Sequence, residues 1–86
     1  MNTKEVAAHY EAKVFDSKDA ASAAGFELAD TMTTRNTWNK ASAAQAIIYR
    51  LLAKKRQGEA GEIGIIIEPQ SITGCYKATE GGGAEG

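Results

Sequence analysis

The pattern of apolar and polar positions changes at Gly58. Before it the chain is rich in alanine, and its larger apolar residues recur at helical spacing. After it, residues 62–68 read Glu-Ile-Gly-Ile-Ile-Ile-Glu, a β-branched run typical of a buried strand. The pattern therefore predicts helices in the first part of the chain and an apolar strand in the second.

The strand over residues 62–68 is expected to pair with a second strand that follows it in the sequence. Three of its isoleucines are expected on one face and a fourth on the other: Ile63, Ile65 and Ile67 against Ile66. Pro69 ends the run, because proline cannot donate to a strand ladder. Residues 69–71 predict a hairpin turn, and the alternation over residues 72–79 predicts a final strand.

The longest helix is expected over residues 38–57. Its apolar stripe recurs every three or four positions: Trp38, Ala41, Ala44, Ile48 and Leu51, flanked by Ile47 and Leu52. The three cations of residues 54–56 suit the negative end of the helix dipole, and Gly58 suits the position just beyond the helix. Residues 33–37 are expected to link this helix to the preceding element, with Asn36 or Thr37 as its cap.

An earlier helix is expected from about Lys18 to Thr33. Asp16 or Ser17 supplies its N-cap, and a stripe of apolar residues is expected to be buried: Ala21, Ala24, Leu28 and Met32. Gly25 falls within this segment, where it either allows close packing or marks a break.

Residues 9–15 alternate between polar and apolar positions, which favours a half-buried strand. A helix that places Val6, Tyr10 and Val14 on one face is the alternative. With the strand, the element order becomes β-α-α-β-β. We expect an α+β fold in two layers, with two helices packed on one face of a small, mainly antiparallel sheet. Residues 1–79 would form one domain, and residues 80–86 a flexible glycine-acidic tail.

The size and charge of the chain limit its possible functions. The chain has 86 residues, ten basic and eleven acidic side chains and a formal charge of −1, which disfavours broad attraction to nucleic acid or anionic lipid. No apolar run is long enough to span a membrane, the start of the chain lacks the apolar segment of a signal peptide, and Cys75 is the single cysteine. We expect a cytoplasmic protein with no membrane contact.

Candidates for chemistry are few. His9 is the single histidine and has no nearby metal-ligating residues in the sequence, so we interpret it as a structural or solvent-exposed side chain. Cys75 lies in a predicted strand and is interpreted as a small apolar residue rather than a nucleophile. Residues 81–83 are three glycines, but they follow no strand-to-helix turn and lack a phosphate-loop lysine. No catalytic residue, cofactor or metal site is predicted.

Residues 17–35 match a helix-turn-helix motif only in part. Ala21 and Gly25 have a suitable spacing, but Thr31 and Thr34 fall where the motif needs apolar residues. A nucleic-acid-binding regulator that uses the helix pair over residues 18–57 therefore stays as the alternative function.

The favoured function is a small non-catalytic module that binds a larger protein or protein complex, as an adaptor or an inhibitor. The absence of recognisable motifs is typical of short proteins of viruses or mobile elements, which include anti-CRISPR proteins. The expected contact residues lie on the second helix and are of types enriched at interfaces: Trp38, Tyr49, Arg50, Lys54, Lys55 and Arg56. An incompletely covered sheet also allows a homo-oligomer through a sheet edge or face.

Overall fold

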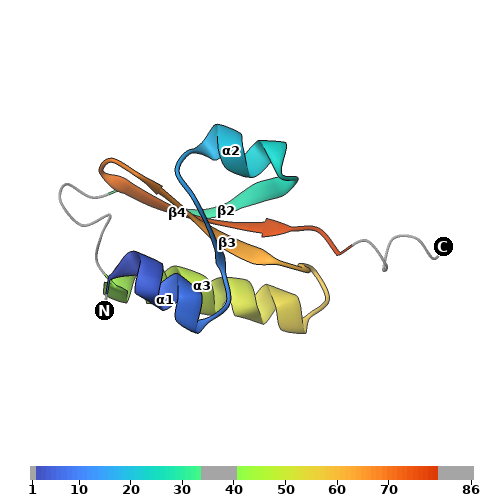
Figure 1. The fold of residues 1–86 in the computed structure, drawn as a ribbon. Coiled ribbons are helices and arrows are strands. Elements are labelled where there is room, and N and C mark those ends of the chain that lie inside the picture. Colours follow the sequence, from blue (N-terminus) through green and yellow to red (C-terminus); the bar gives the residue numbers. More distant parts are fainter. Residues whose placement is uncertain (1, 34–40, 80–86) are drawn as a thin grey trace.

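The computed structural model describes residues 2–33 and 41–79. Three helices and four strands follow one another along the chain: α1 (Thr3–His9), β1 (Lys13–Phe15), α2 (Lys18–Ala23), β2 (Phe26–Thr33), α3 (Ala41–Arg56), β3 (Ile63–Glu68) and β4 (Ser71–Lys77). The strands form one sheet in the order β1-β3-β4-β2, in which β1 and β3 are parallel and the other neighbours antiparallel. Helices α1 and α3 lie side by side on one face of the sheet, and the short α2 lies on the other (Figure 1).

The predicted class is confirmed: the fold is α+β, with two helices on one face of a mainly antiparallel sheet. The element order differs from the predicted β-α-α-β-β, however. The two helices that share a face are α1 and α3, and α2 covers part of the opposite face. The predicted tail over residues 80–86 lies outside the described residues.

The helix predicted over residues 18–33 is wrong beyond residue 23. Ser17 caps α2 as expected, because its hydroxyl accepts a hydrogen bond from the Ala20 amide at 3.1 Å. The helix then ends at Gly25, whose φ of 87° is a left-handed conformation that favours glycine. Gly25 is thus a break, and the chain continues as strand β2.

The N-terminal segment combines both interpretations of residues 4–15. A helix forms first because Asn2 and Glu5 cap it reciprocally: the Asn2 side chain accepts from the Glu5 amide at 2.9 Å, and the Glu5 carboxylate accepts from the Asn2 amide at 2.7 Å. The predicted strand over residues 9–15 is therefore reduced to the three residues of β1. Glu11 joins them with a φ of 58°.

The core has two parts, one on each face of the sheet. The larger lies under α1 and α3 and contains the buried apolar residues Val6, Ala7, Ala44, Ile47, Ile48, Leu51, Ile63, Ile65 and Ile72. The smaller lies under α2 and contains Ala21, Phe26, Ile66 and Cys75, with Phe15 packed against them. The predicted division of the isoleucines between the two faces is confirmed, since Ile67 packs on the first cluster and Ile66 belongs to the second.

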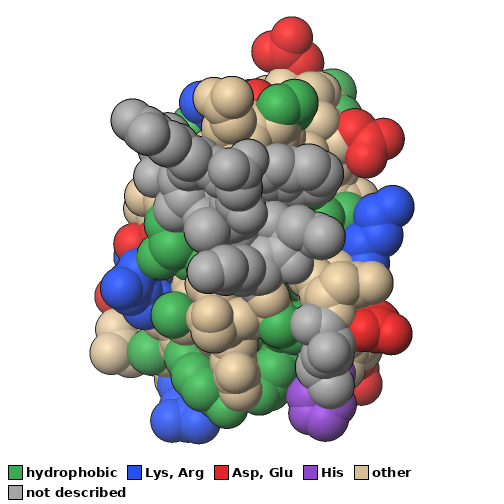
Figure 2. Space-filling model, turned by 90° about the vertical axis from the view of Figure 1, so that its left-hand side faces the viewer, with side chains coloured by type: hydrophobic (Ala, Val, Ile, Leu, Met, Phe, Trp, Pro, Cys, Tyr) green, Lys and Arg blue, Asp and Glu red, His purple; other side chains and the backbone are tan. Residues whose placement is uncertain are grey.

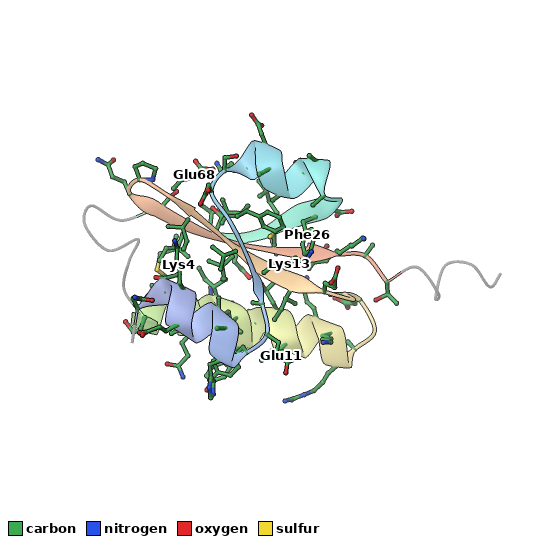
Figure 3. All side chains as sticks on the ribbon, in the orientation of Figure 1. Lys4, Glu11, Lys13, Phe26 and Glu68 are labelled. Atoms are coloured by element: carbon green, nitrogen blue, oxygen red, sulfur yellow. The ribbon has the colours of Figure 1, made fainter. Side chains whose placement is uncertain are left out.

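Two contacts fix the ends of these elements. Gly58 has a φ of 80°, and the Glu59 amide donates to the Lys54 carbonyl at 2.9 Å, which closes α3 at the predicted glycine. On the other face, the Glu68 carboxylate accepts from the Lys18 amide at 2.7 Å, so the end of β3 caps the start of α2 (Figure 3). The hairpin predicted after Pro69 is also confirmed, because Glu68 pairs directly with Ser71.

Candidate protein-interaction surface

The outward side of α3 is almost uncharged before its basic end at Lys55 and Arg56. From Ala41 to Ala53 the helix carries a single charged residue, Arg50. Solvated helices usually present charged and polar residues on the side away from the core. With Ile47, Ile48 and Leu51 in the core, the exposed residues of this stretch are Ser42, Gln45, Tyr49, Arg50 and Ala53, of which only Arg50 is charged.

We define the outer helical surface as six residues of α1 and α3 that lie together at the surface. Four are exposed at spacings of three or four along α3, a fifth is at the helix end, and the sixth closes α1: Ser42, Gln45, Tyr49, Ala53, Arg56 and Tyr10. Hydrophobic side chains gather at the lower end of the molecule in the side view, where α1 and α3 lie (Figure 2).

Tyr49 is the centre of this surface and is 53% exposed. Its hydroxyl lies 2.8 Å from that of Tyr10, and the Gln45 side-chain amide donates to both hydroxyls, at 3.1 Å to Tyr49 and 3.3 Å to Tyr10. The two tyrosine rings meet edge to face at 5.5 Å, and His9 packs on Tyr10 at 4.7 Å. The aromatic side chains are thus held in place while they remain accessible.

The hydrogen bonds within this group shift two pKa values in opposite directions. The bond from Tyr10, assisted by the one from Gln45, lowers the pKa of Tyr49 below the ordinary tyrosine value. The same contact with Tyr49 raises the pKa of Tyr10. A tyrosine hydroxyl can donate or accept a hydrogen bond, so each of the two can also bond to a partner.

The structure divides the six predicted contact residues. Tyr49 and Arg56 share the outer helical surface, and Lys55 is exposed beside Arg56 at the helix end. Arg50 lies on the flank that faces β2, with its guanidinium 3.8 Å from the Asp30 carboxylate and its side chain 57% exposed. Trp38 lies outside the described residues.

Lys54 belongs to the sheet side of α3 rather than to the outer surface. Its ammonium lies 3.7 Å from the Glu59 carboxylate and 5.4 Å from the centre of the Tyr76 ring. It is therefore held by the fold and is less available to a partner than Lys55 and Arg56. The basic end that a partner could contact therefore consists of Lys55 and Arg56 rather than of all three cations.

Sequence reasoning missed Tyr10 and Gln45. Gln45 precedes Tyr49 by four positions on the same helix, a spacing that brings side chains together, so this pair was within reach of the sequence. Tyr10 was not, because its contact depends on α1 and α3 lying side by side.

The other candidates have structural surroundings. Cys75 is fully buried, and burial raises the pKa of its thiol to about 11, so it is a neutral apolar residue as predicted. His9 is exposed in the last turn of α1, also as predicted. In the part of the chain that the structure describes, no group of three His, Cys, Asp or Glu side chains is arranged to hold a metal ion, and no pocket is present.

Two further findings bear on partners. The helix pair of the nucleic-acid alternative does not form, because residues 26–33 are a strand and α2 and α3 lie on opposite faces of the sheet. Among the described residues, no helix is both long enough and apolar enough to cross a membrane. Comparison with protein-family models, curated proteins and solved structures found no match.

Proposed function

We propose that this protein is a non-catalytic interaction module that binds a larger protein or protein complex of the cytoplasm through the outer helical surface, as an adaptor or an inhibitor. The observation that carries the proposal is Tyr49, half exposed yet held by Tyr10 and Gln45 on a nearly uncharged helix surface. Tyrosine and arginine are enriched among residues that dominate binding energy, and Arg56 lies on the same surface.

The fixed geometry of the group supports binding. A side chain that is already ordered in the free protein loses less conformational entropy when a partner covers it. Tyrosine adds a large contact area with only two rotatable side-chain bonds. Ser42 and Ala53, on the same surface as Tyr49, have small side chains, which leave room for a partner to approach the helix.

The test is affinity capture from lysate of the producing or host cell, with quantitative mass spectrometry of the captured proteins. Wild-type protein is compared with Tyr49→Ala and with the control Glu62→Ala, which truncates another exposed side chain. Glu62 lies between α3 and β3, outside the outer helical surface.

We expect a defined partner to be captured by wild type and by the Glu62→Ala control. Tyr49→Ala is expected to weaken capture by about 30-fold or more, the effect of a hot-spot residue. Equal capture by wild type and Tyr49→Ala would show that the partner does not bind through the outer helical surface.

A further inference from the structure

Strand β2 forms one edge of the sheet and is long for an edge strand. Its eight residues pair with β4 on one side, and among the described residues no strand pairs with the other side. The opposite edge, β1, has only three residues. Alternate residues of an edge strand point their backbone N–H and C=O groups away from the sheet, where they can pair with another extended chain.

The two faces of β2 differ in chemistry. On the α2 side, Leu28 lies opposite the buried Cys75 and is 50% exposed, which is unusual for a leucine on a strand next to the core. On the α3 side, Glu27 and Asp30 lie opposite Tyr76 and Gly74, and both carboxylates are at least partly exposed. Before the bulge, the edge is thus apolar on the α2 side and carries a carboxylate on the α3 side.

A β-bulge between Leu28 and Asp30 creates this arrangement. In a regular strand, residues three positions apart face opposite sides, but the extra residue at the bulge brings Glu27 and Asp30 to the same face. The bulge also interrupts the ladder, so that a partner strand pairs with the run before it or the run after it.

These charges argue against a second copy of the chain as the partner of β2. Antiparallel self-pairing centred on the bulge, between Leu28 and Ala29, places Glu27 of one copy opposite Asp30 of the other, and like charges directly opposite across a strand pair are destabilising. Arg50 compensates Asp30 only weakly at 3.8 Å, and among the described residues no cation pairs with Glu27. The edge favours a strand that brings its own positive charges.

We propose that β2 is a second interaction surface, which adds an extended segment of a partner protein as a fifth strand. In the run before the bulge, that segment alternates an apolar residue, which covers Leu28 on the α2 side, with a basic residue, which faces Glu27 on the α3 side. Backbone hydrogen bonds supply affinity, and the alternation supplies specificity. This surface goes beyond the outer helical surface and does not depend on it.

The probe is a short peptide, blocked at both ends, in which valine alternates with lysine. It is titrated to about 1 mM into isotopically labelled protein while amide shifts are followed by NMR. A second peptide, in which glutamate replaces lysine, tests the charge requirement. The protein variants are Glu27→Lys, Leu28→Lys, a matched exposed control Glu62→Lys, and Tyr49→Ala, with circular dichroism to confirm that each is folded.

We expect the lysine peptide to shift amides of β2 and the glutamate peptide to leave them unchanged. Glu27→Lys should weaken binding by about two- to fivefold, the range of one cross-strand charge pair, and Leu28→Lys should weaken it further. Glu62→Lys and Tyr49→Ala should bind as wild type does, so a failure of the helical surface would leave this proposal standing.

Three results would overturn the proposal. The first is the absence of shifts in β2 at the highest peptide concentration. The second is equal binding of the two peptides. The third is a dimer of the protein alone in sedimentation velocity that Leu28→Lys converts to monomer, because the edge would then be occupied by a second copy.

Discussion

The hydroxyl groups of Tyr10 and Tyr49 lie 2.8 Å apart, although the residues are separated by 39 positions in the chain. The contact joins the end of α1 to the middle of α3 at the protein surface. Gln45 donates to both hydroxyls, so three side chains hold one another in place. An exposed aromatic group with this degree of order is the feature on which the proposed function depends.

Removing the hydroxyl of Tyr10 should bring the pKa of Tyr49 closer to the ordinary tyrosine value. In Tyr10→Phe, the hydrogen bond that contributes most to lowering the pKa of Tyr49 is lost, so the pKa of Tyr49 should rise toward about 10. NMR of the Tyr49 ring carbons as a function of pH measures the change. Tyr76→Phe is the control and should leave Tyr49 unaffected; an unmoved Tyr49 pKa in Tyr10→Phe would show that the two hydroxyls do not interact in solution.

Gly74 should tolerate no side chain. A β-carbon there would overlap the Ile47 methyl group and come within 3.1 Å of Leu51, both fully buried in α3. Gly74→Ala should therefore lower the free energy of unfolding by about 1–3 kcal/mol or more. Gly61→Ala is the matched control, because its β-carbon meets only ordinary contacts at 3.5 Å and beyond. Denaturant unfolding compares the two, and equal stabilities would contradict this packing of α3 on β4.

The second half of the fold was predictable because each of its signals is local. Helix α3 has a regular apolar stripe and a glycine at its end, and β3 has an isoleucine run that ends at Pro69. These patterns agree with the tertiary structure at every step, so the sequence suffices to identify the elements. The role of Gly74 in making room for α3 was not predicted, because it depends on how α3 packs on β4.

The first half was harder because its local signals conflict. Residues 26–33 contain apolar residues at helical spacing, and the bulge within β2 removes the regular alternation that identifies a strand. Residues 26–33 form a strand because they pair with β4, a contact that the local sequence does not show. Helix α1 could have been found, since Asn2 followed by Glu5 is a capping signature.

The candidate surface was predictable in its centre but not in its extent. Tyr49 was among the predicted contact residues, but the sequence left open whether it was exposed or part of the core. Lys54 looked equivalent to Lys55 and Arg56 in the sequence, whereas in the structure Glu59 and the Tyr76 ring hold it. The β2 edge could not be anticipated from a segment that was interpreted as a helix.

The hairpin turn contains a residue that should be improved by glycine. Gln70 has a φ of 69°, a left-handed conformation that costs a residue with a β-carbon about 1–2 kcal/mol. Gln70→Gly should relieve this cost, but glycine also gives the unfolded chain more conformational freedom. The net effect should be a rise of about 0.5–1 kcal/mol in the free energy of unfolding. Gln57→Gly, at a position without positive φ, should be neutral or destabilising. Thermal and denaturant unfolding decide, and a loss of stability in Gln70→Gly would contradict the turn geometry.

The basic end of α3 should affect the rate of association. Reversing both Lys55 and Arg56 to glutamate should slow binding to the captured partner and reduce its dependence on salt, because exposed charges act mainly on encounter. The matched change Lys18→Glu, on the opposite face, should have little effect. Stopped-flow or surface-plasmon measurements at two salt concentrations provide the rates. An unchanged association rate would show that Lys55 and Arg56 do not contribute to association, so that Tyr49 and its neighbours alone would form the contact.

The central claim is that a partner covers the outer helical surface, and site-specific photo-crosslinking tests it most directly. A benzophenone amino acid is placed at Ala53, exposed beside Tyr49, or at Ala20, exposed on α2 on the opposite face. After irradiation in the producing or host cell, the adducts are identified by mass spectrometry. The account predicts one defined protein adduct from Ala53 and none of it from Ala20. No adduct from Ala53, or the same adduct from both positions, would contradict it.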